Sequence, residues 1–149
     1  MKALEIIKAN HGNLDDINEI EAEASFNPWP KEITQSYLKS ESAVFFLALS
    51  GNEPAGYISL SFVLDEGSVL NVAVKKTFRR RGIAKALVKA VKDFAKDNKL
   101  AFLSLEVRES NLPAIALYEG EGFRLAGKRP AYYEKPKEDA LIMQYEVNR

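Results

Sequence analysis

The chain has 149 residues, with 21 Lys and Arg balanced by 21 Asp and Glu, so its formal net charge is zero. This length and an ordinary apolar content predict one globular domain over residues 1–149 and exclude a disordered or fibrous chain. The absence of cysteine and the single His11 exclude disulfides, cysteine nucleophiles and Cys- or all-His metal sites, so we expect no metal.

The first half of the chain predicts a strand, two helices and a three-stranded meander. Asn13 is expected to cap the first helix, and the Asn-Pro-Trp-Pro segment at 27–30 to end it. Gly51-Asn52 is a turn signal between two strands. The expected elements are strand Leu4–Ala9, helices Leu14–Ser25 and Lys31–Lys39, and strands Ala43–Ser50, Gly56–Leu64 and Val69–Val74.

The second half predicts helices that alternate with strands. Ile83–Asp97 repeats apolar residues at helical spacing, and Asn111 with Pro113 is a typical start for a further helix ending near Glu119. The expected strands are Leu100–Val107, Phe123–Arg129 and Ala140–Val147. The fold class is therefore α+β, with a mixed, mostly antiparallel central sheet flanked by helices. The strands on either side of Ile83–Asp97 are expected to be parallel, which gives a β-α-β unit.

A basic turn lies between the strand ending at Val74 and the helix starting at Ile83. The free N–H groups at a helix N-terminus, together with the helix dipole, bind anions, and Gly82 lets a phosphate approach the backbone. The three arginines at 79–81 oppose the dipole unless an anion is bound. The alternative interpretation is an exposed basic loop that contacts nothing, or that touches nucleic acid without specificity.

Two residues after this helix are candidates for proton transfer. Glu106 lies on a strand whose Leu103, Leu105 and Val107 face the opposite way, so partial burial could make it a general base. A salt bridge to Arg108 or to a neighbouring strand is the structural alternative. Tyr118 could protonate a leaving thiolate if its hydroxyl reaches a cleft, and is otherwise a core aromatic residue.

The segment Arg79-x-x-Gly82-x-Ala84 resembles the acetyl-CoA signature of the GCN5-related N-acetyltransferase (GNAT) superfamily. The resemblance implies acetyl-CoA as co-substrate. The backbone of residues 79–84 would bind its pyrophosphate, and strand residues 72–74 would pair with its pantetheine arm. The implied cofactor-binding residues are Val72, Ala73, Val74, Arg79, Arg80, Arg81, Gly82, Ile83, Ala84, Lys85, Asn111 and Tyr118.

A closer resemblance, to the ribosomal-protein-alanine N-acetyltransferases, spans nearly the whole chain. It rests on Phe-Asn-Pro-Trp at 26–29, Asn-Val-Ala-Val at 71–74, Leu-Glu-Val-Arg at 105–108, Tyr-Tyr at 132–133 and Glu-Asp-Ala-Leu-Ile-Met at 138–143. It implies that Glu106 accepts a proton, Tyr118 donates one and Asn111 contacts the cofactor. The acceptor would be the α-amine of a protein N-terminus, such as alanine of a small-subunit ribosomal protein. Residues 129–137 match less closely, with Pro130, Ala131 and Pro136 particular to this chain.

Three other functions stay open on sequence alone. They are acetylation of a small amine such as a polyamine, amino acid or antibiotic, binding of acetyl-CoA without catalysis, and binding of nucleic acid through the three arginines. We favour the acetyl-CoA-dependent N-acetyltransferase that acts on a protein N-terminus, with no specific nucleic acid and no membrane as partner. The sequence leaves the oligomeric state open.

The charge is unevenly distributed along the chain. Residues 1–70 hold 11 acidic and 4 basic residues, whereas residues 71–149 hold 10 acidic and 17 basic ones. The split is either accidental or marks two faces for an anionic cofactor and a basic acceptor. No apolar run approaches the length of about 20 residues that spans a membrane, so a cytoplasmic protein is expected.

Overall fold

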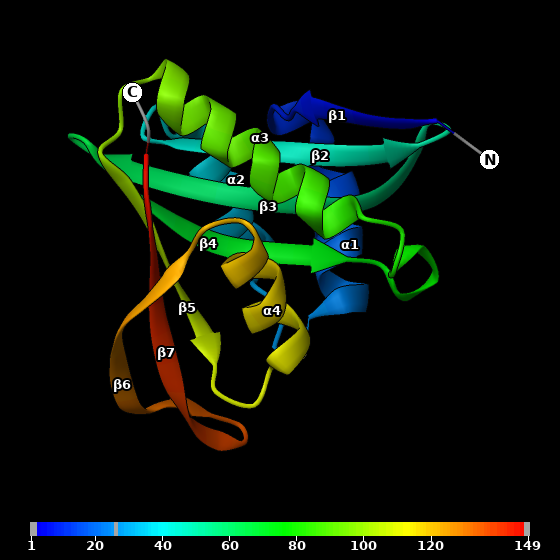
Figure 1. Cartoon of the computed structure of the whole chain (residues 1–149). Coiled ribbons are helices and arrows are strands. Elements are labelled where there is room, and N and C mark those ends of the chain that lie inside the picture. The colour runs from blue at the N-terminus through cyan, green and yellow to red at the C-terminus, as the bar shows by residue number, and fades with distance from the viewer. Residues whose placement is uncertain (1–2, 26, 148–149) are drawn as a thin grey trace.

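A computed structural model describes residues 3–25 and 27–147, so that Phe26 of the 26–29 motif lies outside the described residues. Within these residues, seven strands and four α-helices follow one another in the predicted order, and two short 3-10 helices that were not predicted lie between them (Figure 1). The strands are β1 (Leu4–Lys8), β2 (Ala43–Ser50), β3 (Glu53–Val63), β4 (Glu66–Val74), β5 (Phe102–Arg108), β6 (Arg124–Glu134) and β7 (Lys137–Glu146). The helices are η1 (His11–Asn13), α1 (Leu14–Ala24), α2 (Lys31–Lys39), η2 (Lys76–Phe78), α3 (Ile83–Asp97) and α4 (Leu112–Gly120).

All seven strands form one sheet in the order β1-β2-β3-β4-β5-β7-β6. Among the strands of the described residues, β4 and β5 are the one parallel pair, and the other neighbours are antiparallel. The α+β fold and the β-α-β unit around α3 are therefore confirmed. No helix within residues 3–25 and 27–147 is long and apolar enough to cross a membrane.

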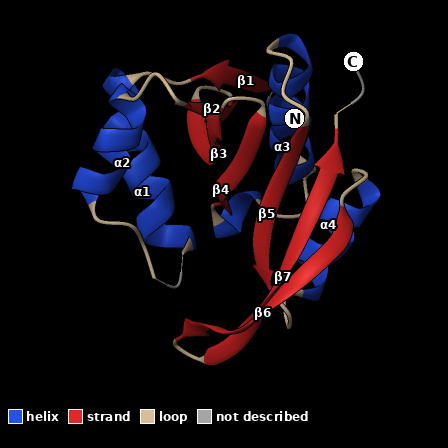
Figure 2. Ribbon diagram, turned by 90° about the vertical axis from the view of Figure 1, so that its left-hand side faces the viewer, coloured by secondary structure: helices blue, strands red, loops and turns tan. Residues whose placement is uncertain are grey.

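Helices cover both faces of the sheet, with α1 and α2 on one side and α3 and α4 on the other (Figure 2). The apolar face of α3 enters the larger core through Ile83, Leu87 and Val91, which are all buried. On the opposite face, Ile17 and Ile20 of α1 pack into a smaller core with Phe45 of β2 and Tyr57 of β3. Each helix pair thus closes a separate apolar core.

The parallel pair β4 and β5 separates after a short stretch of pairing. Glu66, Gly67 and Ser68 pair with Phe102, Leu103 and Ser104, and no further pairing joins the two strands within the described residues. The remaining residues of β4 pair only with β3 on the other side. The middle of the sheet therefore opens, and one edge of β4 faces an open space.

Element boundaries differ from the sequence expectation where turns are tight. β3 begins at Glu53 rather than Gly56 because Gly51 and Asn52 both have positive φ, which lets a two-residue turn pair Ser50 with Glu53 at once. β4 begins at Glu66 because the turn before it consists of Leu64 and Asp65.

The expected cap of α1 by the Asn13 side chain is wrong. Asn13 makes no cap hydrogen bond to the helix, and its Oδ1 instead accepts from Asn10 N–H at 3.0 Å. Asn10 and Asn13 together form a reciprocal capping box on η1, a 3-10 turn that precedes α1. The side-chain cap thus lies at Asn10, one turn before the predicted position, because the sequence contains two asparagines three residues apart.

The last hairpin is longer than expected on both strands. β6 reaches Glu134 and β7 starts at Lys137, with an irregularity in register between Arg129 and Tyr133. Pro130 is tolerated there because β6 is an edge strand, where a missing N–H costs no ladder bond. The hairpin extends well beyond the rest of the sheet (Figure 2).

Candidate active site

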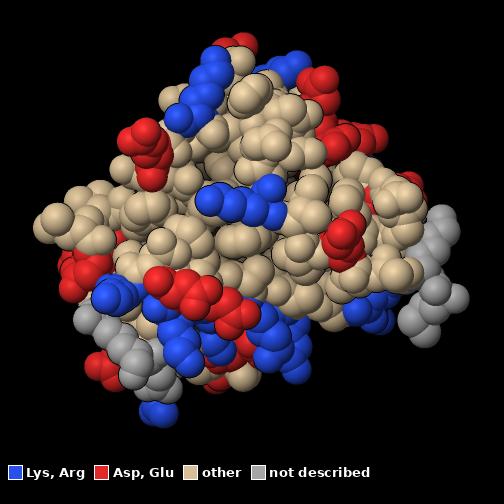
Figure 3. Space-filling model, turned by 90° about the horizontal axis from the view of Figure 1, so that it is seen from above, with Lys and Arg blue, Asp and Glu red and all other residues tan. Residues whose placement is uncertain are grey.

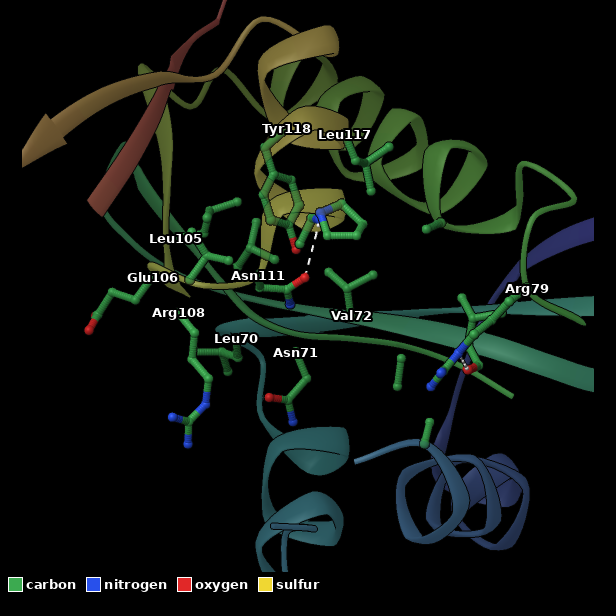
Figure 4. Close-up of a pocket in the computed structure, with 18 of the residues that line it drawn as sticks. Leu70, Asn71, Val72, Arg79, Leu105, Glu106, Arg108, Asn111, Leu117 and Tyr118 are labelled. Atoms are coloured by element: carbon green, nitrogen blue, oxygen red, sulfur yellow. Dashed lines mark hydrogen bonds between the residues drawn. The ribbon is translucent and has the colours of Figure 1, made fainter. Parts of the chain in front are cut away.

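A cavity of about 780 Å³ occupies the opening between β4 and β5 (Figure 4). Nine of the residues expected from the sequence border it, namely Val72, Ala73, Val74, Arg79, Arg80, Ala84, Glu106, Asn111 and Tyr118. Asn71, Arg108, Leu117 and Tyr133 border it as well, without having been assigned a role from the sequence. The structure therefore brings the two candidate proton carriers and most of the expected cofactor residues to one place.

The N-terminus of α3 supplies unpaired donors at one end of this cavity. The first intrahelical bond runs from Ala86 N–H to Gly82 C=O at 3.0 Å, and no side chain caps the helix. Gly82 has φ +77°, and a Cβ added there would meet no atom within 4 Å. Open space, free N–H groups and the helix dipole together fit a phosphate group.

The basic residues around this turn point in different directions. Arg79 folds back, and its Nε donates to Val74 C=O at 3.1 Å. Arg81 lies over the Phe78 ring, 5.4 Å from its centroid, and borders a different cavity together with Ile83. Gly82 and Lys85 do not border the main cavity. Of the three arginines, Arg79 and Arg80 are thus the ones beside the cleft.

The free edge of β4 runs along the cavity as far as the helix turn. Val72 and Val74 face the α3 side, where they pack against the larger core, and Ala73 belongs to the smaller core. Since this edge has no strand partner beyond Ser68 within the described residues, its main-chain groups are free to pair with an extended ligand. The geometry fits a pantetheine arm lying as an additional strand.

Tyr118 points from α4 into the cavity. Figure 4 shows its hydroxyl directed toward the space beside Asn111. The ring is 8% exposed and packs against Phe123, so Tyr118 is a core aromatic residue whose hydroxyl lies at the cleft, and its role as a proton donor stays a prediction. Burial first, and then the charge of Tyr133, raise the pKa of Tyr118 to about 12. Within the described part of the chain its hydroxyl has no hydrogen-bond partner, so the O–H is available to a ligand.

Glu106 reaches the cavity from the other face of the sheet and is more exposed than expected. The burial pattern of β5 alternates as predicted, with Leu105 and Val107 buried. Glu106 itself is exposed because the neighbouring β4 has already diverged at this level. It pairs with Arg129 of β6, whose Nε lies 3.5 Å from Oε2. A salt bridge to a neighbouring part of the sheet is thus present, but its partner is not Arg108.

Asn111 has a structural role in addition to its place beside the cleft. Its Oδ1 accepts from Ala114 N–H at 3.3 Å and so caps α4, as the sequence predicts. This bond fixes the side-chain amide and leaves its nitrogen toward the cavity (Figure 4).

Arg108 anchors the hairpin of β6 and β7 beside the site. Its guanidinium donates to the main-chain oxygens of Lys135 and Pro136 at 3.2 and 2.9 Å and to Glu138 at 3.3 Å. It also lies 4.2 Å from the centroid of the Tyr133 ring. The pKa of Tyr133 is raised by burial and by the charge of Glu106. Sequence reasoning had no signal for this cluster, because it joins residues some 30 positions apart.

Comparisons with known proteins agree with this geometry. The model of the Acetyltransferase (GNAT) family matches residues 14–123. The [ribosomal protein bS18]-alanine N-acetyltransferase of Escherichia coli (strain K12) is 36% identical over 131 residues, covering 87% of this chain and 88% of that protein. The N-alpha-acetyltransferase of Saccharolobus solfataricus is 32% identical, covering 91% and 88%. The crystal structure of the E. coli ribosomal-protein-S18-alanine N-acetyltransferase matches with a TM-score of 0.93 and 32% identity, covering 99% and 96%.

The fold and the site therefore define an acetyltransferase, and the chain belongs to the GNAT family. Acetyl-CoA is the co-substrate of this family, and the uncapped α3 N-terminus with the free β4 edge fits it. The resemblance to ribosomal-protein-alanine N-acetyltransferases is confirmed by the relatives that share about a third of its residues.

Proposed function

We propose that this chain transfers the acetyl group of acetyl-CoA to the α-amine of a protein N-terminus, with alanine of a small-subunit ribosomal protein as the acceptor. The observation that carries the proposal is that Tyr118 of α4 and Glu106 of β5 line one cavity beside the free edge of β4. The E. coli relative, named for acetylating alanine of ribosomal protein bS18, supports the acceptor. Residues 1–149 would act as one domain, since a single sheet runs through the described residues. A ribosomal protein as acceptor would place the reaction in the cytoplasm.

The α3 side of the cleft would bind acetyl-CoA, which supplies an activated thioester. The first-turn N–H groups of α3 hold the phosphates, and the free edge of β4 at residues 72–74 holds the pantetheine arm. Binding both substrates in one cleft converts a bimolecular reaction into an intramolecular one, which is the largest contribution we assign to the site. No covalent enzyme intermediate is required, and the chain has no cysteine to form one.

Glu106 would accept the proton that the acceptor's ammonium must lose, either directly or through a water molecule. An α-amine has a pKa of about 7.7–8.0, against about 10.4 for lysine, so the neutral nucleophile forms readily near pH 7. Its nitrogen then forms a bond to the acetyl carbon while the carbon–sulfur bond breaks. Arg129, which pairs with Glu106 at 3.5 Å and is 57% exposed, can swing away as the amine approaches.

Tyr118 would stabilise the departing thiolate from the other side. A thiol has a pKa of about 8.5, so proton transfer from a tyrosine whose pKa is about 12 is unfavourable at equilibrium. The Tyr118 O–H therefore acts first as a hydrogen-bond donor to the sulfur. Tyr118 then gives its proton to the sulfur. The proton that the acceptor's ammonium has lost reaches Tyr118 through solvent and restores its hydroxyl.

A peptide panel tests the acceptor. Peptides with Ala, Ser, Met or Gly at the first position are compared with N-acetylated peptides, free amino acids and polyamines, by following CoA release at fixed acetyl-CoA concentration. We expect turnover of peptides with a free α-amine, best with alanine first. Turnover of free amines without turnover of peptides would contradict the proposed acceptor and favour a small-amine acetyltransferase.

A further inference from the structure

A carboxylate is buried on α1, on the face of the sheet covered by α1 and α2. The side of the cleft next to this face, opposite the α3 side, is called the acceptor side below. Glu21 is 2% exposed, and both of its oxygens accept hydrogen bonds. The Ser25 hydroxyl donates at 2.7 Å and the Trp29 N–H at 2.9 Å, so Glu21 holds the segment that links α1 to α2. Glu21 is therefore an internal hydrogen-bond acceptor and not part of the acidic surface.

The third donor to Glu21 is the Tyr57 hydroxyl on β3, at 2.8 Å. A carboxylate only accepts hydrogen bonds, so the Tyr57 proton must point to Glu21. Burial and the negative charge of Glu21 raise the pKa of Tyr57, which keeps this proton in place. The lone pairs of the Tyr57 oxygen then remain for a donor on its other side.

That donor is Asn71 of β4, whose Nδ2 lies 3.1 Å from the Tyr57 oxygen. An asparagine amide has a donor end and an acceptor end, and Tyr57 accepts only from the donor end. Glu21 therefore fixes the direction of the Tyr57 proton, and Tyr57 fixes which way the Asn71 amide is turned. The amide oxygen of Asn71 is left without a hydrogen-bond partner among the described residues.

The free oxygen of Asn71 is beside the acceptor half of the cleft. Asn71 borders the cavity and is half-buried. Figure 4 shows it pointing away from Tyr118, toward the face covered by α1 and α2, with its oxygen on the side of Arg108. An acceptor peptide entering between α1 and the hairpin of β6 and β7 would thus meet a fixed hydrogen-bond acceptor.

We propose that Asn71 is an acceptor-binding residue, whose side-chain oxygen accepts a hydrogen bond from an N–H group at the N-terminal end of the acceptor. Tyr57 and Glu21 are positioning residues that hold the Asn71 amide in the required orientation. The N–H group belongs either to the α-ammonium or to the first peptide bond, and both present the same chemistry. This inference rests on the proposed function and deepens it, because it names what recognises the backbone of the acceptor.

The test compares Asn71→Leu and Asn71→Ala with wild type, using two peptides that begin Ala-Ala and Ala-Pro. Tyr57→Phe tests the positioning role. Ser59→Ala is the matched control, because Ser59 is buried directly opposite Asn71 on β3 and its hydroxyl has no hydrogen-bond partner among the described residues. The KM for acetyl-CoA and the thermal unfolding midpoint show whether each variant keeps its fold.

We expect both Asn71 variants to raise the KM for the Ala-Ala peptide about tenfold, the size of one hydrogen bond to the substrate. Tyr57→Phe should raise it about threefold, because the amide can then turn, while Ser59→Ala and the KM for acetyl-CoA should stay within twofold. Proline at the second position lacks an N–H. Loss of the Asn71 effect with the Ala-Pro peptide therefore identifies the peptide N–H as the donor, and persistence of the effect identifies the α-ammonium.

The outcomes separate this inference from the proposed function. A wild-type enzyme that acetylates the peptides, together with Asn71 variants whose peptide KM stays within twofold for both peptides, overturns the inference and leaves the proposed function standing. A wild-type enzyme that acetylates no peptide overturns the proposed function, and the inference with it.

Discussion

The two faces of the sheet prepare the cleft in different ways. On the α3 and α4 face the groups that fit acetyl-CoA are mainly main-chain groups, namely the uncapped helix N-terminus and the free edge of β4. On the α1, α2 and hairpin face, the groups around the site are side chains held by other side chains, such as Glu21 with Tyr57 and Arg108 with Glu138. We call the α3 and α4 face the donor face and the α1, α2 and hairpin face the acceptor face. The donor face depends on local backbone geometry, whereas the acceptor face depends on contacts between distant segments.

The two faces should differ in how easily substitutions change the ligand that they bind. Main-chain groups keep their chemistry when side chains are exchanged, so a cofactor that is common to a family suits the donor face. Side-chain networks change with each substitution, which allows the acceptor to differ between related enzymes. Variants on the two faces should accordingly change different kinetic constants.

The largest expected effect comes from Tyr118, where the two halves of the site meet. Tyr118→Phe should lower kcat by about 10²–10⁴-fold, the range of general acid–base effects, and leave the Kd for acetyl-CoA unchanged. Isothermal titration and steady-state kinetics measure the two quantities. Tyr145→Phe is the control, because it removes a hydroxyl from the same aromatic cluster outside the cleft. An unchanged kcat in Tyr118→Phe would restrict Tyr118 to a packing role.

Glu106→Gln should have the next largest effect, about 10²-fold on kcat/KM for the peptide. The glutamine keeps the shape of the side chain but cannot accept the proton, so only acceptor amine that is already neutral can react. The kcat/KM of the variant should therefore rise more steeply with pH, toward the α-amine pKa of about 7.7–8.0. A pH series from 6 to 9 with a free α-amine peptide measures this. A pH profile identical to that of the wild type would assign proton acceptance to water.

Gly82→Ala tests the donor face alone. A Cβ at φ +77° costs about 1–2 kcal/mol, so Gly82→Ala should shift the turn that positions the first N–H groups of α3, and the Kd for acetyl-CoA should rise about tenfold. The peptide KM at saturating acetyl-CoA should stay the same. Gly120→Ala on α4 is the control, since it also meets open space but without a positive φ. If Gly82→Ala bound acetyl-CoA as tightly as wild type, the phosphate site would have to lie elsewhere.

The smallest expected effect concerns surface charge. The acidic N-terminal half is partly paired within the protein, through Asp15 with Lys31 and Glu19 with Lys75. Figure 3 shows acidic and basic side chains interspersed along one margin of the face seen from above, so the charge split along the sequence does not divide that face. The double variant Asp16→Asn with Glu23→Gln should raise the KM for basic peptides about two- to threefold at low salt, and the effect should vanish at high salt. An equal KM for the variant and wild type at low salt would show that the unequal charge of the two halves of the sequence has no role in binding the acceptor.

Local signals allowed much of the donor face to be predicted from sequence. The apolar repeat of α3, the cap at Asn111 and the turn with Gly82 each lie within a few residues, and the structure confirms the elements they predict. The acceptor face could not be predicted in the same way. Glu21 is one acidic residue among several on α1, and only its distant partner Tyr57 shows that it is buried. Glu106 was expected to be partly buried because the divergence of β4 from β5 has no signal in either strand.

If acetyl-CoA binds as proposed, the opening between β4 and β5 would couple the stability of the fold to the supply of its substrate. A ligand that binds only the native state adds a stabilisation of RT ln(1 + [L]/Kd), about 2.7 kcal/mol at a concentration 100-fold above Kd. Here the ligand would complete the hydrogen bonds of a strand edge in the middle of the sheet, so those amides of residues 69–74 that face away from β3 should exchange with solvent much more slowly when acetyl-CoA is abundant. The lifetime of this protein in the cell would then follow the metabolic state that sets the acetyl-CoA concentration.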